Sequence, residues 1–240
     1  NEIIWKRSEA HSDASAFGAV HDVIFFYRKT RNNIWNRQYT PYTSDYIERQ
    51  FKYVEKESRR RYRSADLSAS GLSGGGYTYE WNGITRSWRC PIQTMERYKS
   101  EGRLDYTGKG LVRYKYYLDE MPGLAIQSVW TDIGKIHHLA DERISYQTQK
   151  PEELLERIIR SSSNDDALVA DFNGGSGTTA AVAEKLGRRW ITTDLGKPAC
   201  MIMRKRLIDQ DAKPFLYQAI GDYQVEAAKA TLGRDFRIGD

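Results

Sequence analysis

The residues best suited to chemistry lie between Asp171 and Asp194. An apolar run, 167–170, ends in Asp171, a glycine-rich turn follows at 174–177, and a second apolar run, 190–193, ends in Asp194. Glycines permit a sharp reversal and let a ligand approach the backbone. Amides at the start of the next helix point into the same space, and the second acid can accept hydrogen bonds from ribose hydroxyls. The segment therefore predicts a site for a ligand that carries an adenosine.

The same segment predicts a strand, a tight turn, a helix over 178–186 and a second strand, the first half of a nucleotide-binding α/β unit. A phosphate-binding P-loop is disfavoured because Gly177, not Lys, precedes the threonine pair. A dinucleotide site fits better, since Gly175, Gly177 and Ala180 match G-x-G-x-x-A. These residues alone leave three interpretations open: S-adenosylmethionine, a dinucleotide, or a purely structural turn.

Composition limits the class of protein. The chain has 240 residues and a net charge of +5, enough for one domain with a large insertion, or two small domains, and an anionic partner. Two cysteines fit a reduced, cytoplasmic protein, and four histidines without a cysteine cluster predict no metal site. No apolar run approaches the roughly 20 residues of a membrane helix, so no membrane partner is expected.

The window 28–118 differs from the rest of the chain. It holds nineteen Lys and Arg against nine Asp and Glu, and twelve of the sixteen tyrosines. Basic side chains interleaved with aromatic ones are typical of surfaces that bind a phosphate backbone and exposed bases, so DNA is favoured over a merely solvated surface. The candidate DNA-binding residues are Arg59, Arg60, Arg61, Arg63, Arg86 and Arg89.

Further elements follow from periodicity and turn residues. Strands are expected at 1–6 and 21–29, paired antiparallel, and a hairpin over 77–88 turns at Asn82-Gly83. The neighbouring His137 and His138 are expected to point apart, which argues against joint metal ligation. The remaining expected elements are helices at 91–101, 152–161, 197–207 and 225–240, and strands at 104–106, 112–116 and 215–220.

Two motifs resemble those of the amino-group (adenine-N6 or cytosine-N4) DNA methyltransferases in their β arrangement. The segment 146–151, Tyr-Gln-Thr-Gln-Lys-Pro, matches motif X, and 171–179 matches motif I, D-x-F-x-G-S-G-T-T. The segments 1–6 and 21–29 resemble the strands before that family's target-recognition region. The resemblance covers nearly the whole chain, to about Tyr223. It implies a Rossmann-like α/β sheet, S-adenosylmethionine as cofactor, DNA as substrate, and a possible restriction–modification partner.

The resemblance also implies roles by residue. The motif X segment would lie around the methionine end of the cofactor, the motif I loop would line methionine and ribose, and the acid after the second strand would take the ribose hydroxyls. The implied cofactor-binding residues are Thr148, Gln149, Lys150, Pro151, Asp171, Phe172, Asn173, Gly174, Gly175, Ser176, Gly177, Thr178 and Asp194.

Two departures from the family pattern matter. Asn173 stands where the family has a Phe that packs beside the cofactor. The catalytic motif, Asp-Pro-Pro-Tyr, occurs nowhere in the 240 residues, and neither Asp222-Tyr223 nor Asp105-Tyr106 replaces it. In the family's strand order, 3-2-1-4-5-7-6, this chain supplies strands 6, 7, 1, 2 and 3. We therefore expect a C-terminal part of a longer enzyme, inactive until the missing N-terminal part supplies strands 4 and 5.

The expected organisation has three parts: hairpin strands at 1–29, a DNA-binding insertion of irregular α+β structure at 30–118, and the cofactor-binding half at 119–240. The expected function is methyl transfer to the exocyclic amine of a flipped base, with adenine favoured over cytosine. A non-catalytic DNA-binding remnant or specificity partner is the second hypothesis. An NAD-dependent oxidoreductase is the third, but it leaves motif X and the basic window unexplained.

Overall fold

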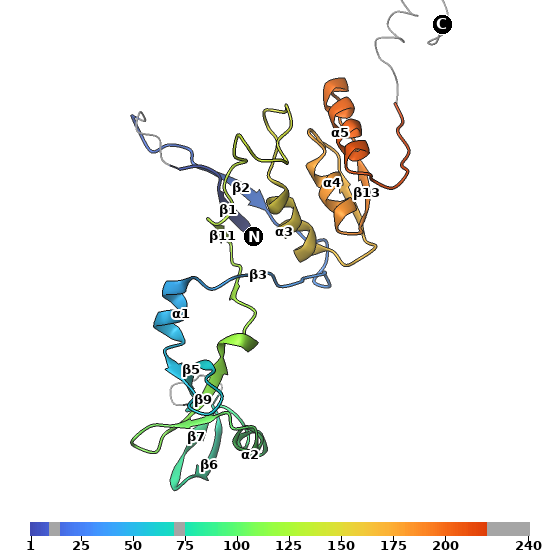
Figure 1. Ribbon diagram of the computed structural model, residues 1–240. Coiled ribbons are helices and arrows are strands. Elements are labelled where there is room, and N and C mark those ends of the chain that lie inside the picture. The colour runs from blue at the N-terminus through green and yellow to red at the C-terminus, as the bar shows by residue number, and fades with distance from the viewer. Residues whose placement is uncertain (10–14, 70–74, 220–240) are drawn as a thin grey trace, which may run out of the picture. The chain divides into compact units, whose positions relative to one another are not determined.

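A computed structural model describes residues 1–9, 15–69 and 75–219. The chain divides into two compact units (Figure 1). Unit 1 joins Asn1–Gln38 to the chain from Gln127 onward, and unit 2 is Tyr39–Ile126. Composition alone places the insertion at 30–118, because the basic character begins before the chain leaves unit 1.

Unit 1 begins with a three-stranded sheet in the order β11-β1-β2. Strand β1 (Glu2–Lys6) pairs antiparallel with β2 (His21–Phe25), as expected, and parallel with β11 (Val129–Trp130). Trp5 anchors the sheet, because its buried indole donates to the carbonyl of Ile133 at 2.8 Å. The sheet therefore fixes the segment that follows β11 against the end of β1.

The second part of unit 1 is the strand–helix–strand unit that the glycine pattern predicts. Strand β12 (Leu168–Asp171) runs parallel to β13 (Arg189–Thr192), with α4 (Thr178–Lys185) between them in sequence. The small side chains of α4 lie fully buried against α3 (Glu152–Ser162) and α5 (Lys197–Asp209). Figure 1 shows these three helices beside β13. The α/β class is therefore confirmed.

Within the described residues, the β12–β13 pair is covered on one face only. Val169 and Trp190 pack on the core beneath α4, whereas their neighbours Leu168 and Ile191 point the other way and are about half exposed. Among the described residues, β12 pairs only with β13 and β2 only with β1, so each has a free edge. Parallel strands are ordinarily covered on both faces, so the exposure of Leu168 and Ile191 is unusual for such a pair.

Unit 2 is built on a four-stranded sheet in the order β4-β5-β9-β8. Trp88 and Met95 are fully buried between this sheet, the hairpin β6–β7 and helix α2, with Leu104 and Val112 beside them. The elements are β3 (Tyr39–Thr40), α1 (Ser44–Gln50), β4 (Tyr53–Val54), β5 (Arg61–Asp66), β6 (Tyr77–Trp81), β7 (Ile84–Trp88), α2 (Ile92–Ser100), β8 (Leu104–Tyr106), β9 (Val112–Tyr117), the 3-10 turn Leu118–Glu120 and β10 (Leu124–Ala125).

The sequence-based expectations fare unevenly. The hairpin is confirmed, with Asn82 at φ 51° and Gly83 at φ 76°, the positive values that a two-residue turn requires. The strand expected at 215–220 is wrong over 215–219, where the chain has no regular structure. Ile220, the Asp222-Tyr223 pair and the helix expected at 225–240 lie outside the described residues.

Candidate functional site

The glycine loop between β12 and α4 is shaped by close packing. Gly177 has φ 74°, and a Cβ built there would lie 2.5 Å from Cγ of Met203 on α5. A Cβ on Gly174 would lie 2.2 Å from Oγ1 of Thr192 on β13. Gly175 also has positive φ, 53°. Side chains at these positions would push the loop away from β13 and α5, so glycine is required for its shape.

Two carboxylates hold the loop at its ends. Asp171 accepts from the amide of Asn173 at 3.0 Å and from the Thr179 hydroxyl at 2.6 Å. Asp194 accepts from the amides of Gly175 at 2.9 Å and Gly196 at 2.8 Å. A carboxylate has about four acceptor positions, so each acid can still accept a bond from a ligand hydroxyl. The structure therefore brings the two predicted acids to one loop.

The segment 146–151 meets the same loop. The Thr178 hydroxyl donates to the carbonyl of Lys150 at 3.3 Å, and a Cβ on Gly175 would lie 3.4 Å from the Tyr146 ring. Pro151 is buried as the N-cap of α3. The two motifs, which are 20 residues apart in sequence, thus form one wall.

The predicted cofactor residues differ in how they are placed. Thr148 and Lys150 are exposed, and the Lys150 ammonium lies 3.8 Å from Asp22. Phe172 is 68 % exposed and Asn173 is also exposed, so the side chains between the two acids lie open to a ligand. Gly174, Ser176, Gly177 and Thr178 are buried, so they offer backbone and hydroxyl groups only.

Both polar atoms of the Gln149 side-chain amide hydrogen-bond to the backbone of the preceding turn. Its Nε2 donates to the carbonyl of Glu142 at 2.6 Å, and its Oε1 accepts from the amide of Ile144 at 2.9 Å. The residue between those two, Arg143, is thereby fixed. In this structure Gln149 orients a loop, whereas the sequence resemblance assigns it to the cofactor.

Arg206 is a site residue that sequence reasoning missed. From α5 its buried guanidinium donates to the carbonyl of Ser176 at 3.3 Å, the Thr178 hydroxyl at 2.9 Å and the Glu152 carboxylate at 2.8 Å. Burial alone would raise the pKa of Glu152, but hydrogen bonds from Lys185 and Arg206 hold that pKa below its usual value. Arg206 of α5 therefore links the glycine loop to α3 by hydrogen bonds.

The histidine pair corrects one expectation. The rings of His137 and His138 do not point apart; their centroids lie 4.2 Å apart at 41°, because both residues sit in an irregular turn and not in a strand. Nδ1 of His137 accepts from the amide of Leu139 at 3.3 Å. Within the part of the chain that the structure describes, no group of three His, Cys, Asp or Glu side chains could hold a metal ion.

In unit 2, strand β5 carries part of the predicted basic run. Arg61 is exposed, whereas Arg60 lies 3.8 Å over the Tyr117 ring and donates to Asp119 at 2.8 Å. Hydrogen bonds to Asp119 and Glu120 raise the pKa of Arg60 further.

The other predicted arginines also differ in their surroundings. Arg63 stacks 4.7 Å over Tyr116, and Arg89 donates to the carbonyl of Ser68 at 2.8 Å. Arg86 lies 5.9 Å over Trp88, and Arg59 is exposed. Arg60 and Arg89 are therefore committed to protein partners, while Arg59 and Arg61 face solvent.

A second charged cluster joins Glu55 to Lys115 and Tyr117 of β9. Glu55 accepts from Lys115 at 2.8 Å and from the Tyr117 hydroxyl at 2.6 Å. Hydrogen bonds from Lys115, Ser58 and Tyr117 lower the pKa of Glu55 to about 2. Burial first, and then the bond to Glu55, raises the pKa of Tyr117 to about 12. The charged groups of this cluster bond to one another, so we assign the cluster to stabilising the sheet and not to binding DNA.

Comparison with known proteins now identifies the family. A family model described as DNA methylase, of the N6 and N4 methyltransferase type, matches residues 1–205. The chain belongs to this DNA methylase family. The expected resemblance is confirmed, and the match includes both motifs and the basic window that precedes them.

Individual relatives agree with the family match. The chain is 26 % identical over 205 residues to Type II methyltransferase M.EcaI of Enterobacter cloacae, and the match covers 84 % of this chain and 45 % of that protein. It is 35 % identical over 125 residues to M.BamHI of Bacillus amyloliquefaciens, covering 51 % and 27 %. It is 39 % identical over 92 residues to DNA adenine methyltransferase YhdJ of Escherichia coli K12, covering 38 % and 30 %. The chain thus spans less than half the length of these relatives.

Proposed function

We propose that this chain forms the cofactor-binding and DNA-binding parts of a methyltransferase that uses S-adenosylmethionine to methylate the exocyclic amine of a flipped base. The observation that carries the proposal is the single wall formed by the glycine loop and the 146–151 segment, held by the Thr178–Lys150 bond and the Tyr146 ring over Gly175. The family match supplies the reaction class.

The residues of this wall fit S-adenosylmethionine. The amides of Ser176 and Thr178, at the start of α4, have no acceptor among the described residues, so they can bind an anionic carboxylate. Asp171 and Asp194 retain acceptor capacity for ribose hydroxyls. The exposed Phe172 ring offers an apolar contact next to Asn173, where the family pattern has a ring of its own. The cofactor supplies a methyl group on a positively charged sulfur.

Catalysis needs a group that this sequence does not contain. An Asp side chain and a Pro carbonyl of Asp-Pro-Pro-Tyr would hold the amine of the flipped base in line with the methyl group, with the Tyr ring stacked on the base. We propose that a segment carrying this motif also supplies two strands that pair with the free edges of β2 and β12. The half-exposed Leu168 and Ile191 support this, since such strands bring helices that cover them.

Finer points of the proposal follow from the relatives. Adenine is favoured over cytosine, in keeping with the name of the YhdJ relative. The arginines of unit 2, foremost Arg59 and Arg61, would contact the DNA backbone beside the target. Action alongside a restriction enzyme is proposed because the relatives include Type II methyltransferases. The described chain holds no helix long and apolar enough to span a membrane.

The first experiment is calorimetric titration of the 240-residue chain with S-adenosylmethionine, with NAD as the control ligand. Binding of S-adenosylmethionine alone is the expected result. Binding of NAD in its place would contradict the cofactor assignment. The second experiment adds a separately produced polypeptide carrying Asp-Pro-Pro-Tyr and measures transfer of labelled methyl groups to DNA. Recovery of activity supports an enzyme part, and DNA binding without recovery favours the non-catalytic alternative.

A further inference from the structure

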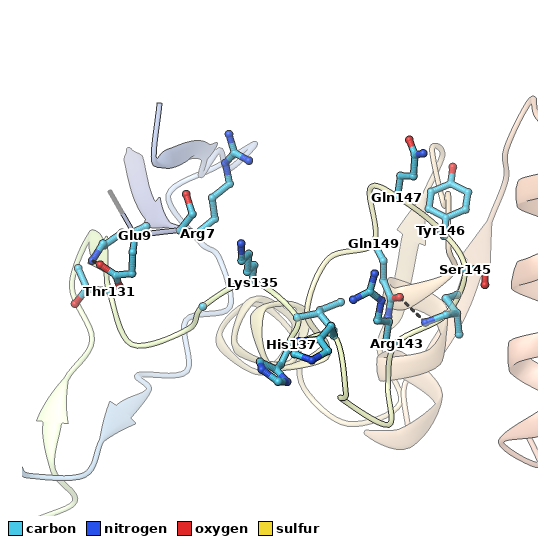
Figure 2. Close-up of a pocket in the computed structure, with 16 residues that line it drawn as sticks. Arg7, Glu9, Thr131, Lys135, His137, Arg143, Ser145, Tyr146, Gln147 and Gln149 are labelled. Atoms are coloured by element: carbon cyan, nitrogen blue, oxygen red, sulfur yellow. Dashed lines mark hydrogen bonds and ion pairs between the residues drawn. The ribbon is translucent and has the colours of Figure 1, made fainter. Parts of the chain in front are cut away.

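A basic hollow lies beside the cofactor wall in unit 1. The hollow has a volume of about 990 Å³ and is lined mainly by residues 6–9, 134–138 and 143–147. Figure 2 shows Lys135, His137 and Arg143 around its middle, with Arg7 and Glu9 toward one end and Tyr146 toward the other. Four of its lining side chains are cationic, namely Lys6, Arg7, Lys135 and Arg143, against the single carboxylate of Glu9.

Two of the four cations are already neutralised. Lys6 lies 2.7 Å from Glu9, and Arg7 lies 3.1 Å from Asp22. The side chains of Lys135 and Arg143 are exposed, and no acidic partner is found for either among the residues that the structure describes. The hollow therefore presents two uncompensated positive charges.

Of the three acids nearest in sequence, Asp132 and Glu142 are used elsewhere, and Asp141 is exposed and does not line the hollow. The Asp132 carboxylate accepts from Arg157 at 2.9 Å, and that bond holds the pKa of Asp132 below its usual value. The Glu142 carboxylate accepts from the amide of Glu152 at 2.8 Å, at the start of α3. Neither acid is left to neutralise Lys135 or Arg143.

The two cations are held in place by backbone contacts. The amide of Lys135 donates to the carbonyl of Arg7 at 3.0 Å, which ties the loop to the end of β1. Gln149 bonds to the backbone on either side of Arg143, at Glu142 and Ile144. A guanidinium and an ammonium presented from fixed backbones in a concave site suit a phosphate group, which accepts several charge-assisted bonds.

The hollow continues into the cofactor wall through Tyr146, which lines the hollow and also covers Gly175. A phosphate bound there would lie close to the cofactor. We infer that Lys135 and Arg143 bind a backbone phosphate of the DNA next to the nucleotide to be methylated, with Gln149 as the positioning residue for Arg143. This inference rests on the proposed function and adds a DNA contact outside unit 2.

The test measures binding of a fluorescent DNA duplex to the full chain at several salt concentrations. The variant Lys135→Ala/Arg143→Ala is compared with Lys213→Ala, an exposed cation away from the hollow. We expect the double variant to bind about tenfold more weakly and its salt slope to fall by about 1, because one phosphate contact contributes about 0.9 to that slope. Lys213→Ala should match the wild type, and all three should bind S-adenosylmethionine equally.

Other outcomes separate the possibilities. Unchanged DNA affinity and salt slope in the double variant, with normal S-adenosylmethionine binding, would overturn this inference and leave the proposed function intact. Failure of the wild-type chain to bind either ligand would overturn both. Inorganic pyrophosphate is titrated in parallel: loss of pyrophosphate binding in the double variant, with DNA binding unchanged, would assign the hollow to a free phosphate compound and reject DNA as its ligand.

Discussion

The role given to Arg206 can be tested by replacing it with a residue of similar size and no charge. Arg206→Met removes the donor that joins Glu152 on α3 to the carbonyl of Ser176 and the hydroxyl of Thr178. Glu152 would keep Lys185, 2.6 Å away, as its second partner. The perturbation thus uncouples the glycine loop from α3 and α5 without creating a large cavity.

The magnitude follows from the three bonds. The bond to the Glu152 carboxylate is worth about 1.5–3 kcal/mol and the bond from the charged guanidinium to the Thr178 hydroxyl about 1.5 kcal/mol, while the longer bond to Ser176 adds less. Glu152 remains partly exposed and keeps Lys185, so the penalty falls below the full cost of orphaning a buried charge. Burial of the Met side chain offsets part of the loss. The net expectation is a loss of about 2–3 kcal/mol in the free energy of unfolding.

Urea unfolding at neutral pH measures this loss, and calorimetry measures the affinity for S-adenosylmethionine, which we expect to fall about tenfold because the loop amides lose their alignment. The matched control is Arg204→Met on the same helix, where an exposed guanidinium lies 5.4 Å over Tyr217 and is worth at most about 1 kcal/mol. Adding Glu152→Gln to Arg206→Met should recover at least about 1 kcal/mol, since the buried charge is removed. Equal costs for Arg206→Met and Arg204→Met would refute the reasoning.

Three further predictions concern single residues. Gly177→Ala should destabilise the chain by about 2–4 kcal/mol in urea unfolding, because it combines a left-handed backbone with overlap against Met203. Asp194→Ala should weaken S-adenosylmethionine binding at least tenfold by calorimetry, because it removes the acceptor for the Gly175 amide and for ribose. Glu55→Gln should change the pH dependence of stability: the contribution of Glu55 is complete above about pH 4.5 and is lost as the pH falls toward its folded pKa of about 2, so wild type and variant should converge there.

Each of these has a discriminating comparison. Gly187 follows the end of α4, where a Cβ would meet open space and only the positive φ opposes a side chain. Gly187→Ala should therefore lower the free energy of unfolding less than Gly177→Ala does. Asp209→Ala removes a carboxylate paired only with an exposed lysine and should leave cofactor affinity unchanged. A constant stability gap between wild type and Glu55→Gln from pH 6 to pH 2 would show that folding does not lower the pKa of Glu55.

The parts that could be predicted from sequence are governed by local rules. Asn82-Gly83 specifies its hairpin, and the helix expected at 152–161 is present as α3, because turn chemistry and helical periodicity act within a few residues. The glycine loop was predictable for the same reason. The expected strand is absent over 215–219. The ring of Phe215 packs 5.5 Å from that of Trp190, and this contact does not require a strand.

The parts that could not be predicted depend on contacts between distant residues. In the sequence, nothing distinguishes Arg206 from an ordinary basic residue on a helix. Only the tertiary structure brings it to Ser176, 30 positions earlier. Gln149 matches motif X, yet its amide holds the turn around Arg143. A motif identifies where a site lies, but the partner of each polar atom is decided by how the chain packs.

The basic window shows why counting charges overstates a DNA surface. Arg60 and Arg103 both bind the Glu120 carboxylate, at 2.5 Å and 2.6 Å, and Lys115 binds Glu55. These cations give a high local charge but are held by acids distant in sequence: Glu120 lies in the 3-10 turn after β9, and Glu55 follows β4. Conversely, Lys135 and Arg143 stand in a part of the chain with no net excess of positive charge, yet the carboxylates of Asp132 and Glu142 are held by other groups and Asp141 lies outside the hollow. Phosphate binding depends on cations that lack a carboxylate partner, and the fold decides which cations those are.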